Sequence, residues 1–404
     1  MIFQIAWKNI WRNKKRSLIL LFAICLGIWG GIFTNGVFIG MWETTIEAVI
    51  NRELSHIQIH HPDFRNEKLV NQFILNIRLV REKIRSNQFV KNFSERTILE
   101  GMISSPVSSS AIKILGIEPN DEKQITSIYN GIVEGSYFEE DKANQIVIGE
   151  KLADKLKVKL NSKVVLSFQS LDNNLTSGAF RVVGIFKSES LMFDASTCFV
   201  KREDLLPLLG AGDVIHEVAI RVTDINLIDS VRNQLRREMK DCVVEDWEEL
   251  APEFAMTRGI LYLELNIFMG IILFALLFGI SNTMMMSVFE RIREFGVLLA
   301  IGMKRIKLFS LIILESIMLL FTGGLIGAFL GWITIELLSN RGIDLSIVEA
   351  GLTTYGMPPI LYPQLPFHMF VSLFLMMFIT AMLAAVSPAV KAVRLKPAEA
   401  IRSF

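Results

Sequence analysis

The strongest pattern in the sequence is a set of four long apolar stretches that contain no Asp, Glu, Lys or Arg. These stretches are Ser17–Trp42, Leu265–Phe289, Ser316–Ile335 and Pro366–Val390. Each reaches the ~20 residues that an α-helix needs to cross a bilayer. The pattern therefore predicts an integral membrane protein, with transmembrane helices at 17–42, 265–289, 308–335 and 366–390.

The N-terminal segment 1–16 places apolar and basic residues at helical spacing. Trp7 and Trp11 alternate with basic residues such as Arg12. Tryptophans at headgroup depth are typical of a helix that lies in the membrane interface. The apolar stretch that follows is longer than the core of a signal peptide, which favours an uncleaved first transmembrane helix.

Between the first two apolar stretches, region 43–264 alternates short apolar segments with turn-rich polar ones. β-Branched and aromatic residues predict strands at 54–61, 111–117, 145–149, 163–168, 180–186, 197–201, 215–222 and 241–245. Helical periodicity predicts helices at 69–84, 150–156, 201–209 and 226–239. We expect an α+β domain in which 54–117 and 215–245 form one subdomain. A β-rich subdomain, about 118–212, would be inserted into it.

The distribution of basic residues predicts the orientation. They cluster before the first apolar stretch, in 290–307 and in the tail 391–404, whereas loop 336–365 has Arg341 as its only basic residue. Basic loops stay in the cytoplasm. Both termini and 290–307 should therefore be cytoplasmic, and the large domain and loop 336–365 should lie on the external, periplasmic side.

The composition excludes some classes of function but does not identify a chemical activity. The chain is 51% hydrophobic and 21% charged with a net charge of +1, so it has no global field suited to nucleic acid. Cys198 and Cys242 both lie in the external region and could form a disulfide or remain two free thiols. The sequence leaves these alternatives open.

Two features inside the apolar stretches stand out. Glycines spaced four residues apart predict close helix packing, and a contact between two copies of the chain is one option. These glycines are Gly27, Gly31, Gly323, Gly327 and Gly331. Glu315 is the one carboxylate within a membrane segment. It is either a functional intramembrane acid or a partner of a Lys or Arg in 290–307.

Motifs for catalysis or for cofactor binding are absent: the sequence contains no P-loop, GxSxG, HExxH or CxxC. We therefore predict no catalytic, cofactor-binding or metal-binding residue. His56, His60 and His61 are the only polar cluster with the identity of metal ligands. On a strand, His56 and His60 would be too far apart for a compact site, so we expect a half-exposed strand face.

Segment 290–307 alternates charged and apolar residues. The pattern predicts a short amphipathic helix parallel to the membrane, with Phe295 and Leu298 presented to a partner's groove. Gly296 and Gly302 would allow close approach or a bend. The charges around them are Glu290, Arg291, Arg293 and Glu294. An ordinary interfacial loop helix is the alternative interpretation.

The segment FERIREFGVLLAIGMKRIKLFSLIILESIMLLFTGGLIGAFLG, at 289–331, resembles the signature of FtsX-type ABC transporter permeases. The matching positions are Glu290, Arg291, Arg293, Glu294, Gly296, Ala300, Gly302 and Glu315. AWKNIWRNKKRSL (6–18) and SPAVKAVRLKPAEAIR (387–402) are similar to the family's opening and close. In the external region, GIEP (116–119), QIVIGEKLADKL (145–156) and FRVVGIF (180–186) resemble its extracytoplasmic domain.

The resemblance implies four transmembrane helices with the external domain between the first and the second. It also implies a homo- or heterodimer of permeases in the inner membrane, with two cytoplasmic ATPase subunits that bind ATP and Mg. The chain itself would bind no cofactor directly. The coupling helix would be Glu290–Gly302. ATP binding would move the external domains without necessarily passing a substrate through the bilayer, which is called mechanotransmission.

Size and layout are most similar to lipoprotein-releasing permeases (LolC/LolE) or to the membrane part of macrolide exporters (MacB). We expect a non-catalytic permease subunit that releases lipoproteins to a periplasmic carrier or adaptor, in contact with membrane lipids. The alternatives are MacB-like export of peptides, antibiotics or lipids, and FtsX-like signalling to a cell-wall hydrolase.

Overall fold

The computed structural model describes residues 2–139, 142–210 and 212–394, which form two compact units. Unit 1 contains the chain up to Trp42, then Thr257–Ile343, then the chain from Leu361 on. Unit 2 contains Glu43–Met256 and Asp344–Ile360. Of the predicted tail 391–404, the part from 395 on lies outside the described residues.

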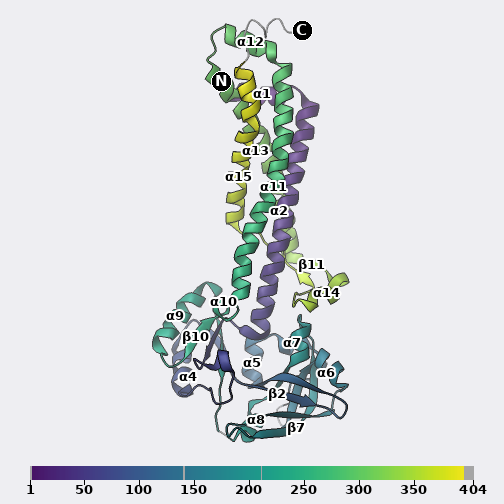
Figure 1. The fold of residues 1–404 in the computed structure, drawn as a ribbon, viewed down its shortest axis with the longest axis vertical. Coiled ribbons are helices and arrows are strands. Elements are labelled where there is room, and N and C mark those ends of the chain that lie inside the picture. The colour runs from purple at the N-terminus through teal and green to yellow at the C-terminus, as the bar shows by residue number, and fades with distance from the viewer. Residues whose placement is uncertain (1, 140–141, 211, 395–404) are drawn as a thin grey trace. The chain divides into compact units, whose positions relative to one another are not determined.

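Unit 1 is a bundle of long helices. Its elements are α1 (Ile2–Ile10), α2 (Lys14–Val49) up to Trp42, α11 (Pro252–Glu290) from Thr257, α12 (Ile292–Ala300), α13 (Arg305–Arg341) and α15 (Phe367–Val393). Among the described residues, α2, α11, α13 and α15 are the helices long and apolar enough to cross a membrane. They contain the four predicted apolar stretches, apart from Pro366, which caps α15, and they extend beyond them into polar residues. Figure 1 shows these helices running lengthwise beside one another, with α1 and α12 at one end of the bundle.

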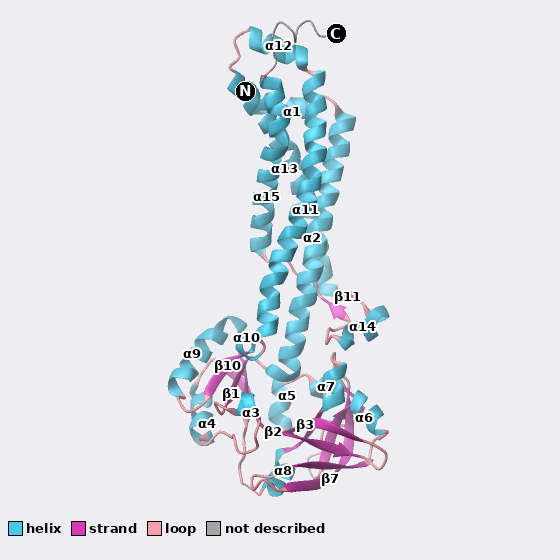
Figure 2. Ribbon diagram, in the orientation of Figure 1, coloured by secondary structure: helices cyan, strands magenta, loops and turns pink. Residues whose placement is uncertain are grey.

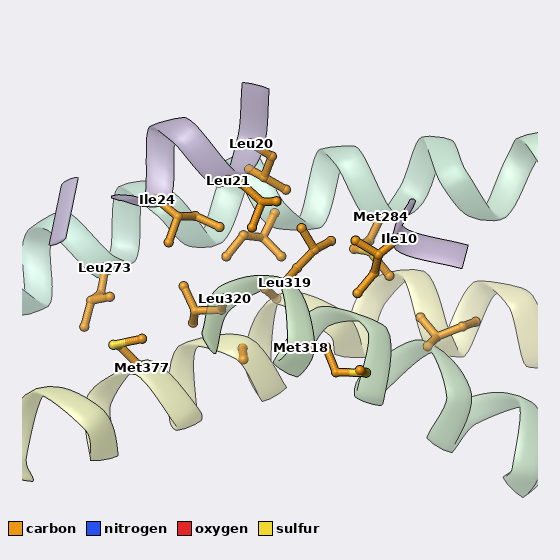
Figure 3. Packing of buried hydrophobic residues seen from close by; sticks show 14 of the residues in the cluster. Ile10, Leu20, Leu21, Ile24, Leu273, Met284, Met318, Leu319, Leu320 and Met377 are labelled. Carbon is orange, nitrogen blue, oxygen red and sulfur yellow. The ribbon is translucent and has the colours of Figure 1, made fainter. Parts of the chain in front are cut away.

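The core of unit 1 is a continuous layer of aliphatic side chains and methionines. Figure 3 shows Ile24 of α2, Leu273 of α11, Leu320 of α13 and Met377 of α15 converging between the helices. Each of these side chains is at most 1% exposed. Lipid tails are as apolar as these side chains, so close van der Waals packing, rather than exclusion from water, holds such helices together in a membrane.

Glycines let α13 approach α2 closely. A Cβ added to Gly323, Gly327 or Gly331 would lie 2.9 Å from Ile24 Cγ2, 2.5 Å from the Cys25 carbonyl oxygen and 2.6 Å from Ile32 Cγ2, respectively. Such separations are shorter than a carbon atom allows, so these three positions tolerate only glycine at this helix spacing. This is the close packing that the glycine spacing predicts.

The glycines of α2 face a different helix. A Cβ on Gly27 would meet Leu276 at 3.3 Å, and one on Gly31 would meet Met269 at 2.6 Å, both on α11. In this structure Gly27 and Gly31 therefore serve packing within one chain, and this face of α2 is not free to contact a second copy.

Unit 2 is built on a mixed sheet whose strands are among the magenta arrows of Figure 2, which also shows β11 of a separate two-stranded pair. The strand order is β10-β1-β9-β2-β3-β8-β5-β7-β4, and β6 pairs with both β2 and β7. The strands are β1 (Ile57–His60), β2 (Val90–Ser104), β3 (Ser109–Ile117), β4 (Ile132–Gly135), β5 (Gln145–Gly149), β6 (Lys163–Gln169), β7 (Leu175–Phe186), β8 (Thr197–Lys201), β9 (Glu217–Val222) and β10 (Val243–Asp246).

Strand β2 joins the two halves of the sheet. Residues Val90–Arg96 pair with β9, whereas Thr97–Ser104 pair with β3. Strand β3 pairs in parallel with β8. The predicted division at residue 118 is therefore wrong, because β3 and the second half of β2 belong to the β-rich half. The sequence pattern also missed β2 itself, since Lys91, Glu95 and Arg96 interrupt its apolar alternation.

Short helices surround the sheet of unit 2. They are α3 (Phe64–Glu67), α4 (Ile77–Ser86), α5 (Pro119–Ile125), α6 (Glu150–Leu156), α7 (Leu191–Ser196), α8 (Arg202–Leu209), α9 (Ile228–Glu238), α10 (Trp247–Leu250) and α14 (Glu349–Thr354). The predicted helix 69–84 begins only at Ile77. The segment before it is irregular and contains turns, and the Ile74 amide donates to the Ile215 carbonyl while the Val70 carbonyl bonds to His216.

Three smaller features complete the chain. A π-helical turn, η1 (Ile50–Leu54), follows α2, and the short strands β11 (Ile343–Asp344) and β12 (Ile360–Leu361) pair with each other. Turns of 3₁₀ helix lie at Ile128–Gly131, Ile225–Leu227 and Ser346–Val348. All three cysteines, including Cys198 and Cys242, are free thiols.

Candidate partner-binding site at the α1–α12 end of the bundle

Helix α12 lies between two breaks in the backbone. Helix α11 ends at Glu290, Arg291 leaves the helical conformation, and α12 runs from Ile292 to Ala300. Gly302 has φ +100°, a value that other residues rarely adopt, and α13 begins at Arg305. Two turns separated by nine residues thus hold a short helix across the end of the bundle, as the charge and apolar pattern predicts.

Arg291 and Glu315 form the centre of this end. The Arg291 Nη1 atom lies 3.0 Å from Glu315 Oε1 and 3.3 Å from Oε2, and both side chains are about 95% buried. Asn9 of α1 donates to Glu315 Oε1 at 2.5 Å. Arg291 also donates from Nε to Glu294 at 3.2 Å, and its guanidinium lies 4.8 Å from the centre of the Phe295 ring. Of the two interpretations of Glu315, pairing with a basic residue of 290–307 is the one observed.

Two more ion pairs connect the start of the chain to the same region. Arg12 donates to both carboxylate oxygens of Glu294, at 2.7 and 2.9 Å. Arg16, at the start of α2, lies 3.0 Å from Glu290 at the end of α11. The polar contacts therefore link α1, α2, α11, α12 and α13. We call this set the end network: Asn9, Arg12, Arg16, Glu290, Arg291, Glu294 and Glu315.

Phe295 does not lie where the sequence pattern places it. Its side chain is 1% exposed and packs in the core of unit 1, and Leu298 is half-buried against that core. The expectation that Phe295 is presented to a partner is therefore wrong in this structure, because α12 turns Phe295 inward under the Arg291 guanidinium. The apolar side chains that α12 exposes are Val297 at 45%, and Ile301 just after its end at 79%.

An apolar groove of about 520 Å³ runs between α1 and α12. We call it the α1–α12 groove. Ile5, Val297, Leu298, Met303 and Leu311 supply its apolar lining, and Asn9, Arg291, Arg293 and Glu294 supply its polar edge. An apolar floor with charges around it is the arrangement that binds an amphipathic segment of another protein.

The remaining predicted residues take separate roles. Gly296 is buried in α12. The packing glycines lie along α2 and α13 rather than in the end network. Sequence reasoning did not assign Asn9, Arg12 or Arg16 to this site. The only signal for the last two was the cluster of basic residues before the first apolar stretch.

The histidines of region 56–61 belong to unit 2, where His56 and His60 contact different partners. His60 Nε2 lies 2.7 Å from Glu245 Oε2. His56 Nδ1 accepts a hydrogen bond from the Val222 amide, and burial, followed by the charge of Arg221, lowers the pKa of His56 to about 4. Both side chains are less than 10% exposed, so the expected half-exposed strand face is wrong. Within the described residues no group of three or more His, Cys, Asp or Glu is placed to hold a metal ion.

Two family profiles match the sequence. The MacB-like periplasmic core domain matches residues 17–238, and the FtsX-like permease C-terminal domain matches residues 266–397.

Curated relatives agree with these matches. An uncharacterized ABC transporter permease of Methanocaldococcus jannaschii is 22% identical over 99% of this chain and 97% of its own length. The macrolide export ATP-binding/permease protein MacB of Brucella abortus is 28% identical over 55% of this chain. The pyoverdine export ATP-binding/permease protein PvdT of Pseudomonas syringae is 28% identical over 70% of it. The match covers only 33% of that MacB and 42% of that PvdT.

Solved structures also match part of the chain. The periplasmic region of MacB from Actinobacillus actinomycetemcomitans matches with a TM-score of 0.37 and 12% identity, covering 52% of this chain and 97% of that structure. The extracellular domain of the ABC-type transporter YknZ matches with a TM-score of 0.35 and 14% identity, covering 47% of this chain and 99% of that structure.

Proposed function

The chain belongs to the FtsX-like ABC transporter permeases with a MacB-like periplasmic core domain, and we propose that it transmits the ATPase cycle of a separate cytoplasmic subunit to unit 2. As a member of this family with four apolar helices, it is a multi-pass membrane protein. In the proposal it performs no catalysis itself, and the partner ATPase binds ATP and Mg.

The proposed orientation places the α1–α12 end in the cytoplasm and unit 2 outside the inner membrane. Basic residues support it, because Arg12, Arg16, Arg291 and Arg293 all lie at the α1–α12 end. Positively charged segments are retained on the cytoplasmic side.

The observation that carries the proposal is the end network. A force on α12 acts on α13 through the Arg291–Glu315 pair, because Arg291 directly precedes α12, and on the turn between α1 and α2 through the Arg12–Glu294 pair. Because the central pair is buried, water does not screen it as it screens a surface pair. Helix α12 therefore cannot shift far without taking α1 and α13 with it, which is what a coupling helix requires.

The α1–α12 groove is the proposed binding surface for the ATPase. Its apolar floor offers Val297 and Leu298 to an apolar side chain of the partner, and Arg293 and Glu294 provide charges at the edge. A second permease subunit, identical or different, would complete the complex, as in other members of the family.

To test this surface, the tagged chain is co-expressed with each stand-alone ABC ATPase of the source genome and purified in detergent. Val297→Asp should abolish co-purification of the cognate ATPase, because a carboxylate would be buried in the interface. The matched control is Val348→Asp, since Val348 is similarly exposed at 53% but belongs to unit 2. Unchanged co-purification with Val297→Asp, in a protein that is still inserted in the membrane, contradicts the proposed surface.

For the cargo, we propose release of lipoproteins from the inner membrane to a periplasmic carrier or adaptor. The names of MacB and PvdT, relatives that share half or more of this chain, favour export as a second candidate. Depletion followed by membrane fractionation separates the two. Lipoproteins retained in the inner membrane support release, whereas normal lipoprotein sorting with increased sensitivity to exported compounds supports export.

A further inference from the structure

A cavity of about 510 Å³ opens in unit 2 beside the π-helical turn η1. Arg52 of η1, Lys113 of β3, and Met192 and Phe193 of α7 line part of it. All of these residues belong to unit 2, so the cavity is separate from the end network and from the α1–α12 groove.

Arg52 is incompletely satisfied. Its side chain is 5% exposed, and its Nη2 atom donates to Glu53 Oε1 at 2.9 Å. Its Nε and Nη1 atoms are buried and have no hydrogen-bond partner within the described residues. The guanidinium lies 5.2 Å from the centre of the Phe193 ring. Buried cationic donors without acceptors are costly, so a protein that retains them usually supplies an acceptor from elsewhere.

The nearby carboxylates accept hydrogen bonds or form ion pairs elsewhere, although the charge of Arg52 also acts on Asp194. Asp194 accepts hydrogen bonds from the amide and the hydroxyl of Ser188. Glu100, which also lines the cavity, lies 3.2 Å from Lys68. Glu53 accounts for one nitrogen of Arg52 only. The other two nitrogens have no acceptor within the described chain, so a water molecule or a ligand has to supply one.

The backbone around Arg52 is unusual as well. A π-helical turn is rare and is found often at functional sites. The next residue after η1, Ser55, has φ 58° and ψ −170°, a conformation that is almost restricted to glycine. The Ser55 hydroxyl donates to the Ile220 carbonyl at 2.7 Å and helps to hold this conformation. The strained turn fixes the direction in which Arg52 leaves the chain.

We propose that this cavity binds an anionic amphiphile, a molecule with a carboxylate or phosphate group and an apolar tail. The anionic group pairs with the Arg52 guanidinium where this side chain lines the cavity, because a guanidinium binds such oxygens strongly. The tail lies against Ile112, Met192 and Phe193. Met192 is 77% exposed, and its flexible thioether can adapt to apolar groups of different shape. This site goes beyond the proposed function and needs no ATPase.

Binding is measured by titration calorimetry on the full-length protein in phosphatidylcholine nanodiscs, with empty nanodiscs subtracted. Octyl phosphate and decanoate should bind at one site per chain, and octyltrimethylammonium at least about tenfold more weakly, because only the anions can accept from Arg52. Comparable binding of the cationic amphiphile contradicts the proposal. Inorganic phosphate that binds as tightly as octyl phosphate also contradicts it, since the site would then recognise a free anion without a tail.

Arg52→Gln should weaken the binding of octyl phosphate at least about tenfold, the loss expected for charge-assisted hydrogen bonds. The matched control is Arg85→Gln, because Arg85 also lies over a phenylalanine of unit 2, at 5.9 Å from the Phe93 ring, but is exposed and does not line the cavity. Equal binding by the native protein and a folded Arg52→Gln variant contradicts the assignment.

A second measurement needs no variant. Hydrogen exchange of the native protein should slow at residues 50–54 and 190–197 when octyl phosphate is added, since these segments line the cavity. Octyl phosphate that binds the chain but leaves exchange in both segments unchanged contradicts the proposed location, even where Arg52→Gln fails to fold.

Discussion

At the scale of single residues, the pair Arg291–Glu315 shows how two charges can be kept inside a helix bundle. Burying an ion pair is costly unless its remaining hydrogen-bonding capacity is used. Here Asn9 and Glu294 supply that capacity, one to each partner. The Phe295 ring covers the guanidinium. The sequence indicated a pairing of this type, but only the fold brings α1 into it.

We expect Glu315→Leu to lower the stability of the protein by about 3–5 kcal/mol, because it leaves Arg291 buried without its main acceptor. Combining Glu315→Leu with Arg291→Met should recover most of this loss, since a whole ion pair can be replaced by apolar side chains at little cost. Thermal unfolding in detergent measures both. Arg16→Gln is the control, because it removes the more exposed pair with Glu290 and should cost less than about 1 kcal/mol. A double variant no more stable than Glu315→Leu contradicts this account.

His216 is a second residue whose environment fixes its chemistry. It is fully buried in unit 2, its Nδ1 accepts from the Ile98 amide at 3.1 Å, and its Nε2 lies 2.9 Å from the Val70 carbonyl. The neutral ring with a proton on Nε2 satisfies both contacts. Burial lowers the pKa of His216 to about 4, although the hydrogen bond to Val70 opposes this shift.

Stability should therefore fall on acidification. The unfolded chain takes up a proton at His216 near pH 6.5 and the folded chain only near pH 4. The contribution of His216 to the free energy of unfolding is thus complete above pH 6.5 and is lost as the pH falls toward 4, by about 3 kcal/mol in total.

His216→Gln should be less stable than the native protein at pH 7.5 but should lose less stability between pH 7.5 and 5, as measured by thermal unfolding. His61→Gln, at a partly exposed position on the same unit, should keep the native dependence on pH. An equal acid loss in His216→Gln and the native protein excludes this role.

At the scale of elements, local sequence patterns were sufficient where a short apolar run or a helical repeat of apolar residues defines the element. The strand 145–149 and the helix 150–156 have the bounds that their residues predict. Strand β2 could not be found in this way, because Glu95 and Arg96 are buried against partners distant in sequence. Arg96 binds both Glu122 and Glu217. Hydrogen bonds from Arg81, with the charge of Arg202, lower the pKa of Glu95 even though burial raises it.

Helix α12 shows the same limit in the candidate site. Its charge pattern predicted a helix at the correct place, but not which side faces the bundle. That choice depends on the packing of the bundle, whose core buries Phe295 and leaves Val297 exposed. A periodic pattern defines two faces of a helix, and only the neighbouring elements decide which of them a partner can reach.

The glycines of the membrane helices give a prediction at this scale. Gly327→Ala should destabilise the bundle by about 1–3 kcal/mol, because the added Cβ meets the Cys25 carbonyl oxygen at 2.5 Å and backbone cannot move away cheaply. Gly270→Ala on α11 is the matched control, since no described atom lies within 4 Å of its added Cβ. It should be neutral or stabilising by up to about 1 kcal/mol. If thermal unfolding shows equal losses of stability in the two variants, close α2–α13 packing is contradicted.

At the scale of the whole molecule, the distribution of charge connects the fold with the proposed function. The ion pairs of the end network lie at the α1–α12 end of unit 1. Most of the remaining charged pairs belong to the sheet and helices of unit 2. A chain with basic residues at one end of its membrane helices inserts with that end in the cytoplasm. Which partners can reach the α1–α12 end and which can reach unit 2 depends on this orientation, so the orientation has to be measured directly.

Cysteine labelling in intact cells measures it. Val348→Cys, exposed in unit 2, should react with a membrane-impermeant maleimide, whereas Val297→Cys, exposed on α12, should react only after the cells are permeabilised. Both are made in a Cys242→Ser background, because Cys242 is a partly exposed free thiol in unit 2. Cys198 is fully buried, and burial raises its pKa, so it should not react. When Cys242 is restored, the maleimide should also label this cysteine in intact cells. Labelling of Val297→Cys in intact cells would reverse the orientation and exclude a cytoplasmic ATPase from the α1–α12 groove.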